Sequence, residues 1–252
     1  LPTDCPQRNE RMGWTGDAQA YTRTATYNSD VYGFFRQWMR SLRADQTEEG
    51  GIGSTIPEYK RERPAGFPDG TTWGAAVCMV PWQLYCQYGD KQIVRDNLDA
   101  MVRWLDGMAR YPMSERFPHL SGKATGLADW LAMDARTPAD LVNNAIYIYM
   151  LEVTAQMADA VGRPDISRRL AERHQQAKRE WNLCYVDEAT GQTRAVQDTL
   201  VHTQSSYATP LNFNCFSDEN RPRAQQWLEL LAERPSQSGK GGMKFTDHTI
   251  TT

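Results

Sequence analysis

Helical segments of two kinds alternate along this sequence. Thr71–Tyr88 is apolar on most of its sides, whereas Lys91–Tyr111, which follows it, carries its apolar residues at intervals of three and four. A helix that is apolar all round is buried on every side, and an amphipathic helix keeps one face in water. Such pairs predict an all-α protein with an inner layer of buried helices and an outer layer of amphipathic ones.

Three all-α architectures fit this two-layer pattern. An α/α toroid is built from such pairs, and a simple helical bundle or a helical solenoid would also fit. The sequence shows no fixed repeat period, which disfavours the solenoid. A small hairpin is expected near Thr190 and Gly191, between two helices. The remaining expected helices are Asp17–Asn28, Asp30–Ala44, Pro138–Val161, Pro164–Cys184, Asp198–Thr209 and Arg221–Glu233.

Local signals place some of the helix ends. Pro138 is a favourable first helical residue, Thr137 before it can act as the N-cap, and Gly162 ends the same helix. Asp17, with Thr15, is expected near the cap of the first helix. Pro81 should kink Thr71–Tyr88 or mark a first turn, because proline has no backbone N–H to donate.

The amino-acid composition disfavours several classes of protein. The chain has 252 residues, 40% of them hydrophobic, and a net charge of −3. It is long enough to bury a substantial core, and its charge gives no reason to expect nucleic acid as a partner. No apolar run is long enough to predict a membrane span. The five cysteines are widely spaced and the four histidines are scattered. We therefore expect no disulfide framework, no metal site and no cofactor.

The two ends of the chain lack the usual marks of a complete protein. It begins at Leu1 without an initiator methionine or a signal-peptide pattern, and it ends with "KFTDHTITT". We interpret residues 1–252 as a segment of a longer polypeptide that forms one incomplete domain. Signals for localisation would then lie outside the segment, and the sequence does not predict an oligomeric state.

The opening stretch "TDCPQRNERMGWTGDAQ" crowds charged and aromatic residues together. Asp4, Glu10 and Asp17 lie six and seven residues apart, with Arg8 and Trp14 between them. Pro6, Gly13 and Gly16 disfavour one continuous helix, so the carboxylates can face one concavity. Paired carboxylates are what glycoside hydrolysis requires, an aromatic ring can stack on a sugar, and a guanidinium can bind hydroxyls or a carboxylate. An ordinary surface network of ion pairs with an N-cap would use the same residues.

Two long loops rich in glycine and proline are further candidates for a site. They read "TEEGGIGSTIPEYKRERPAGFPDG" and "FPHLSGKATGLADW". Long loops that join packed helices often carry binding and catalytic residues.

Several strings, in order along nearly the whole chain, resemble bacterial α-L-rhamnosidases of glycoside hydrolase family 78. The string "DCPQRNERMGWTGDAQ" is similar to the start of that family's catalytic domain. The strings "WGAAVCMVPWQLYCQYGD" and "GLADWLA" are similar to two later family segments, and "DHTITT" resembles the run before a Gly-Phe-x-Gly-Thr turn. The resemblance implies an (α/α)6 barrel or toroid, truncated here at its C-terminal end. It also implies removal of terminal non-reducing α-L-rhamnose, with inversion, from rhamnose-containing glycosides or polysaccharides.

The resemblance also implies roles for particular residues. Glu10 matches the family's general acid. Asn9 and Ala75 stand where many members carry an acidic residue, which concerns fine specificity rather than the reaction. The general base of the family follows the Gly-Phe-x-Gly-Thr turn, so it is expected beyond Thr252. The residues that match the rhamnose pocket are Asp4, Arg8, Trp14, Asp17, Trp73 and Trp130.

Two other functions remain open at this point. One is a related toroid glycosidase with another sugar preference, such as a fucosidase-like enzyme. The other is a carbohydrate-binding protein of the same fold that does not hydrolyse its ligand. Glu219, Glu229 and Glu233 lie too early in the sequence to match the base, so the residues present do not separate hydrolysis from binding.

Overall fold

The computed structural model describes residues 9, 11–58, 71–129 and 136–233, and within them the regular structure is helical. The only strand-like pairing in this part of the chain consists of isolated bridges. None of its helices combines the length and the hydrophobicity that a bilayer crossing requires. The helices are α1 (Thr15–Asn28), α2 (Tyr32–Asp45), α3 (Thr71–Gly74), α4 (Ala76–Tyr88), α5 (Lys91–Ala109), α6 (Ala139–Ala160), α7 (Pro164–Tyr185), α8 (Ser205–Asn212) and α9 (Asn220–Glu233).

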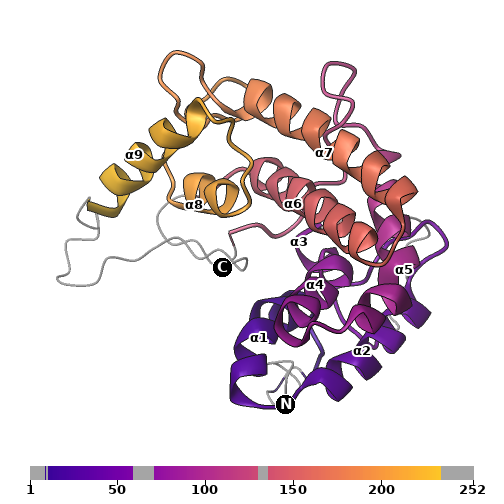
Figure 1. Ribbon diagram of the computed structural model, residues 1–252. Helices are drawn as coiled ribbons and strands as arrows, with labels where there is room; N and C mark the ends of the chain where they lie inside the picture. Colours follow the sequence, from indigo (N-terminus) through magenta and orange to yellow (C-terminus); the bar gives the residue numbers. More distant parts are fainter. Residues whose placement is uncertain (1–8, 10, 59–70, 130–135, 234–252) are drawn as a thin grey trace.

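The helices form successive hairpins that follow one another along an arc (Figure 1). Helices α1, α4, α6 and α8 contact one another in that order and make the inner layer. Helices α2, α5, α7 and α9 each return along the outside. This is the two-layer arrangement that the alternating pattern predicts. Whether the whole chain is one domain stays a prediction.

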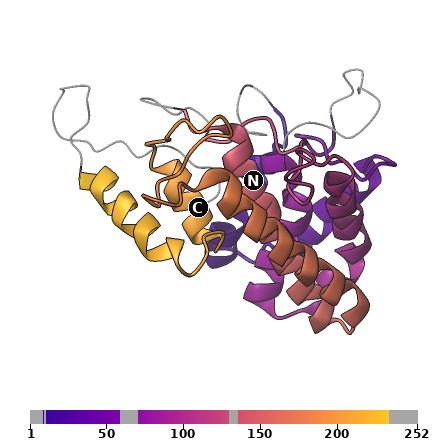
Figure 2. The same ribbon diagram turned by 90° about the horizontal axis from the view of Figure 1, so that it is seen from above.

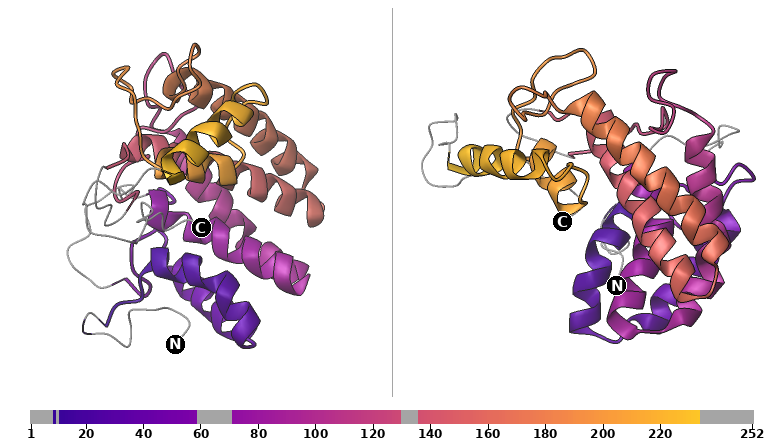
Figure 3. Two further views of the ribbon diagram at one scale, coloured as in Figure 1. Left: turned by 90° about the vertical axis from the view of Figure 1, so that its left-hand side faces the viewer. Right: turned by 45° about the horizontal axis from the view of Figure 1, so that its top comes forward.

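The α6–α7 hairpin explains why the two patterns alternate. Helix α6 is buried on nearly all sides, from Leu141 to Ala158. Helix α7 buries a stripe that includes Leu170 and Trp181 and exposes the rest. Figure 3 shows the two helices side by side, with α7 on the outside. An inner helix needs apolar side chains in all directions because it is covered on all sides, and its outer partner needs only one stripe.

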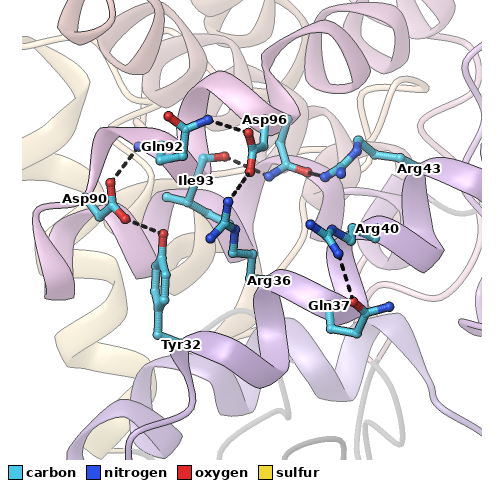
Figure 4. A network of polar contacts seen from close by, with 10 residues as sticks. Tyr32, Arg36, Gln37, Arg40, Arg43, Asp90, Gln92, Ile93 and Asp96 are labelled. Carbon is cyan, nitrogen blue, oxygen red and sulfur yellow. Dashed lines mark hydrogen bonds and ion pairs between the residues drawn. The ribbon is translucent and has the colours of Figure 1, made fainter.

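Polar side chains supplement the outer layer between α2 and α5, as Figure 4 shows. The Tyr32 hydroxyl donates to Asp90 Oδ2 over 2.6 Å, and Asp90 also caps α5 by accepting from the Gln92 amide. Arg36 forms an ion pair with Asp96, with 3.3 Å between the guanidinium nitrogen and the carboxylate oxygen. These bonds lie on the water-facing side, away from the inner helices.

Connections of two lengths place the loops at opposite ends of the hairpins. Short turns join the members of each pair, as at Ser29–Val31, Gly89–Asp90 and 161–163. The connections between pairs are long and cover 46–70, 110–138 and 186–204. The described parts of the long connections gather on one side of the molecule, at the top of Figure 2. The inner helices therefore begin at the end that carries the long loops.

Some helix ends differ from the prediction. The expected helix Thr71–Tyr88 is interrupted at Ala75, and Pro81 lies inside α4 rather than in a first turn. Thr137 does not cap α6, because its hydroxyl donates to Asp129 and Pro138 occupies the cap position without a side-chain bond. Helix α8 begins at Ser205, later than expected. The small hairpin is confirmed as a bridge between Val186 and Thr193.

Candidate active site

The inner helices begin close to one another at the end that carries the long loops. Gly16 in α1 lies against the ring of Trp73 in α3, and Thr72 contacts Asn143 in the second turn of α6. Thr137, just before α6, shares a hydrogen bond with Thr203, just before α8, over 2.6 Å between the hydroxyl oxygens. The residues before α1 and α6 make no side-chain cap, whereas the Thr203 hydroxyl accepts from the Ser206 amide in the first turn of α8 over 3.3 Å. Residues far apart in the sequence therefore meet at this end of the molecule.

The segment that leads into α1 is fixed by pairing with residues 53–56. The Ile56 amide donates to the Gly13 carbonyl over 2.8 Å, and the Thr15 amide donates to the Ser54 carbonyl over 2.8 Å. A Cβ atom on Gly13 would lie 2.4 Å from the Ile56 carbonyl oxygen, so only glycine fits there. Trp14 lies between these two anchors, half-buried, as the residue that precedes α1.

Three of the residues predicted from the sequence lie together at this end. Trp14 precedes α1 and Asp17 lies in its first turn. Trp73 is buried, with 7% of its surface exposed. It packs on Gly16, which lies between Trp14 and Asp17 in the sequence. A Cβ atom on Gly16 would lie 2.7 Å from Cε2 of the Trp73 indole, so the absence of a side chain lets the indole approach α1.

The other predicted residues are Asp4, Arg8, Glu10 and Trp130, and they lie outside the described residues. The convergence of Asp4, Glu10 and Asp17 on one pocket with Trp14 therefore stays a prediction. The role of Glu10 as general acid stays a prediction as well.

A buried polar cluster, which the sequence analysis missed, lies beside Trp73. It consists of Gln19 in α1, Thr72 in α3 and Asn143 in α6, with 2%, 0% and 0% of their surfaces exposed. Gln19 Nε2 donates to the Thr72 carbonyl over 2.6 Å. The Thr72 hydroxyl contacts the Leu127 carbonyl and the Asn143 side chain. The sequence carried no signal for this cluster, because Gln19 lies in a largely polar stretch, and Thr72 and Asn143 each stand beside another residue of the same type.

A second buried contact joins Asp129 and Thr137, which precede and follow the segment that contains Trp130 in the sequence. Asp129 Oδ2 accepts from the Thr137 amide over 3.0 Å and from the Thr137 hydroxyl over 2.6 Å. These two residues stand on either side of 130–136 in the sequence. The carboxylate of Asp129 thus joins the two sides of this connection and links it, through Thr203, to the start of α8.

The connection between α5 and α6 is also attached to the helices below it. The Ser121 amide donates to Asn144 Oδ1 over 2.8 Å. The His119 amide donates to Glu180 Oε2 over 2.8 Å, and the His119 ring Nδ1 lies 2.5 Å from Glu180 Oε1. Bonds to both α6 and α7 therefore hold this loop in place.

A cavity of about 430 Å³ lies between α1, α4, α6 and the end of α8, and Gln19 of the polar cluster forms part of its lining. Among the residues that the structure describes, none of the predicted site residues lines it, and its lining contains no Asp or Glu. Its described lining residues are Gln19, Ala20, Arg23, Tyr27, Met79, Trp82, Gln83, Cys86, Gln87, Tyr149, Asn212 and Phe213. Hydrolysis of a glycosidic bond uses carboxyl groups, and the described lining of this cavity supplies none. Within the described ranges, no group of three or more His, Cys, Asp or Glu side chains could hold a metal ion.

The chain is similar to proteins named alpha-L-rhamnosidase. One from Formosa agariphila is 31% identical over 243 residues, which is 92% of this chain and 24% of the relative. One from Streptomyces avermitilis is 30% identical over 239 residues, 92% of this chain and 21% of the relative. The chain thus spans about a quarter or less of the length of these curated relatives.

Solved structures give the same assignment. The alpha-L-rhamnosidase of Streptomyces avermitilis complexed with L-rhamnose matches 92% of this chain and 21% of its own, with a TM-score of 0.78 and 30% identity. The native enzyme from Aspergillus terreus matches 92% of this chain and 27% of its own, with a TM-score of 0.78 and 28% identity. Together with the helical hairpins, these matches confirm the all-α toroid architecture, of which this chain represents a part.

A family model provides the broadest match. The model for the bacterial alpha-L-rhamnosidase 6 hairpin glycosidase domain covers residues 1–243. Because this match includes nearly all of the chain, the chain belongs to the family of bacterial alpha-L-rhamnosidase six-hairpin glycosidase domains.

Proposed function

We propose that this protein hydrolyses terminal, non-reducing α-L-rhamnosides in glycosides or polysaccharides. One observation carries the proposal: Trp14, Asp17 and the buried Trp73 lie at the loop-bearing end of the inner helices, around Gly16. Membership of the rhamnosidase family supports the choice of sugar. The relative from Streptomyces avermitilis, whose structure contains L-rhamnose, supports it too.

The proposed reaction proceeds with inversion at the anomeric carbon. Glu10 donates a proton to the glycosidic oxygen as the bond from that oxygen to the anomeric carbon breaks. A second carboxylate takes a proton from a water molecule as the water oxygen bonds to the anomeric carbon from the opposite face. In inverting enzymes the two carboxyl groups are roughly 6.5–9.5 Å apart, which leaves room for that water. The proton given up by Glu10 is balanced by the one taken up by the base.

The remaining site residues bind and orient the sugar in this proposal. Trp73 offers an apolar surface, and Trp14 and Trp130 add further rings that can stack on the faces of the sugar. Asp17 and Asp4 accept hydrogen bonds from hydroxyls, and Arg8 donates to them. The residues assigned to binding are Asp4, Arg8, Trp14, Asp17, Trp73 and Trp130.

The experiment that tests the proposal is an assay of the full-length protein on a panel of aryl glycosides and on a natural rhamnoside. We expect release of L-rhamnose, with the β-anomer appearing first in proton NMR spectra. Preference for a fucoside would favour the related toroid glycosidase, and saturable binding of rhamnose without hydrolysis would favour a binding protein. Initial release of the α-anomer would contradict inversion.

The position of the base can be tested separately. That the base lies beyond Thr252 stays a prediction, and it implies that residues 1–252 alone are inactive. Residues 1–252 and the full-length protein would be purified and assayed side by side on an aryl rhamnoside. Retention of about a tenth or more of the full-length rate would place the base within residues 1–252, because loss of a general base usually lowers rates by ~10²–10⁴-fold.

A further inference from the structure

The turn that carries Trp73 is too short to hold its own position. Helix α3 has four residues, Thr71 to Gly74, and isolated helices shorter than about 12 residues are marginal in water. Its placement must therefore come from contacts with other elements. Thr71 supplies one, because its hydroxyl donates to the Lys123 carbonyl over 3.0 Å.

Thr72 supplies contacts to three other elements from a single residue. Its carbonyl accepts from Gln19 of α1 over 2.6 Å, and its hydroxyl contacts Asn143 of α6 and the carbonyl of Leu127. The residue is fully buried, so no water competes for these bonds. Thr72 is thus the point at which α1, α6 and the loop before Asp129 are joined to the turn of Trp73.

The chemistry of the hydroxyl makes this arrangement specific. Thr72 Oγ1 has one hydrogen but faces two oxygens, Leu127 O and Asn143 Oδ1. Asn143 Nδ2 is buried without a partner among the described residues. If the Asn143 side-chain amide is rotated so that Oδ1 and Nδ2 exchange places, the Thr72 hydroxyl donates to the Leu127 carbonyl and accepts from Asn143 Nδ2. The hydroxyl then acts both as a donor and as an acceptor. Valine has the same shape as threonine but can make neither bond.

We propose that Thr72 is a positioning residue that holds the indole of Trp73 against α1 in the geometry that binds the sugar. This inference rests on the proposed function for the identity of the ligand. The packing of Trp73 on Gly16 provides the physical link, because a shift of α3 moves the indole relative to Trp14 and Asp17. Displacement of a positioning group weakens binding and catalysis without removing any reacting atom.

The test compares Thr72→Val with Thr72→Ser in the full-length protein. Thr72→Val should raise the KM for an aryl rhamnoside and the Kd for L-rhamnose by about tenfold, with a smaller change in kcat and an unchanged pH profile. Thr72→Ser keeps the hydroxyl and should restore both constants to within about twofold of the wild type. The matched control is Thr154→Val, a buried threonine of α6 about 16 Å along the helix from Asn143. It should leave both KM and the Kd for L-rhamnose unchanged.

A second readout reports on Trp73 without any sugar. Protein labelled with 5-fluorotryptophan gives a fluorine NMR signal for each tryptophan, and Trp73→Phe identifies the one that belongs to Trp73. Thr72→Val should shift or broaden that signal, and Thr154→Val should leave it unchanged. Gln19→Met removes the donor to the Thr72 carbonyl and should move the same signal, so it serves if Thr72→Val does not fold.

The outcomes separate this inference from the proposed function. A Thr72→Val protein with a lower Tm but unchanged KM, Kd and Trp73 signal would overturn the positioning role. If the wild-type protein neither binds nor hydrolyses rhamnosides, the proposed function is wrong. The fluorine signal then decides by itself whether Thr72 positions Trp73.

Discussion

The two ends of the helical hairpins are stabilised by different forces. At the end with the long loops, buried polar contacts join separate elements, as between Gln19 and Thr72 and between Asp129 and Thr137. Toward the end with the short turns, aromatic rings pack in the interior, as in the stack of Tyr149 on Phe213 with ring centres 4.5 Å apart, and polar bonds such as that between Tyr32 and Asp90 lie on the outer surface. Hydrogen bonds are directional and fix geometry, whereas apolar burial is non-directional and supplies stability. Contacts at the loop end thus mainly fix the relative positions of side chains, and packing toward the turn end mainly contributes to the free energy of unfolding.

The buried cysteines contribute to the apolar packing of the interior. Burial raises the pKa of the Cys78 thiol to about 12, and it raises the pKa of Cys215 strongly as well. A thiol with so high a pKa stays protonated at neutral pH and is a poor nucleophile. These residues act as small apolar side chains in the packed interior.

The largest expected effect comes from changing the residue that we propose as the general acid. Glu10→Gln in the full-length protein should lower kcat on a natural rhamnoside by ~10²–10⁴-fold while rhamnose still binds, because an amide cannot protonate the leaving oxygen. Steady-state kinetics and a binding titration measure the two effects. The matched control is Glu229→Gln on the exposed surface of α9, which should change neither. Near-wild-type turnover of Glu10→Gln on a natural substrate would refute its role as the acid.

The next largest effect is expected in the apolar interior. Leu151→Ala in α6 removes a fully buried side chain and should lower the free energy of unfolding by about 2–5 kcal/mol without changing KM. Urea unfolding and kinetics below the transition measure the two quantities. Leu230→Ala on α9, where half of the side chain is exposed, should have a much smaller effect. A changed KM for Leu151→Ala would show that the two ends are not independent.

A pH effect of intermediate size is expected between α6 and α7. Burial, and then the nearby Lys178, lowers the pKa of His174 to about 4. Between pH 6.5 and 4 the unfolded chain takes up a proton at His174 that the folded protein does not. The free energy of unfolding should therefore decrease as the pH is lowered from 6.5 to 4, and the loss should reach about 1–2 kcal/mol at pH 5.

The variant His174→Gln isolates this contribution. Glu152 Oε2 lies 3.9 Å from His174 Nε2, and burial raises the pKa of Glu152, which acts in the opposite sense as the solution is acidified. The difference between the wild type and His174→Gln, measured by urea unfolding at several pH values, removes the part due to Glu152. Parallel stability profiles for the two proteins between pH 6.5 and 4 would contradict the assignment.

The smallest effect is expected on the outer surface. Asp106 pairs with Arg169 and Arg173, with 2.8 and 3.0 Å between the charged atoms, and the pairs are partly exposed. Asp106→Asn should lower the free energy of unfolding by about 1 kcal/mol or less, and added salt should reduce the difference. A loss as large as that for Leu151→Ala would show that the outer layer contributes more than its exposure suggests.

The sequence predicted most helices well because the periodicity of apolar residues is a local signal. Helix α7 begins at Pro164 as predicted and ends one residue later than expected. The prediction for α8 was wrong at its start, because residues before Ser205 pair with distant ones, as when the Thr203 hydroxyl shares a hydrogen bond with the Thr137 hydroxyl. Pairing between distant segments has no signature in a local pattern.

The candidate site also contains residues that the sequence predicted and residues that it missed. The opening string identified Trp14 and Asp17 because they lie close together in sequence. Gln19, Thr72 and Asn143 were missed because their contacts span 53 and 71 residues of sequence, and a polar residue does not reveal so distant a partner. Thr137 was read as a cap, although its hydroxyl donates to Asp129 instead.

The common starting end of the inner helices has an electrostatic consequence. An α-helix carries about half a positive charge at its N-terminus, and α1 and α6 begin there without side-chain caps. The resulting positive potential attracts negatively charged groups to that end. A carboxylic acid that must keep its proton at neutral pH needs the opposite influence, and rings that exclude water, such as Trp73, provide it. At this end, backbone amides would therefore stabilise the ionised form of a base, and aromatic side chains would stabilise the protonated form of an acid.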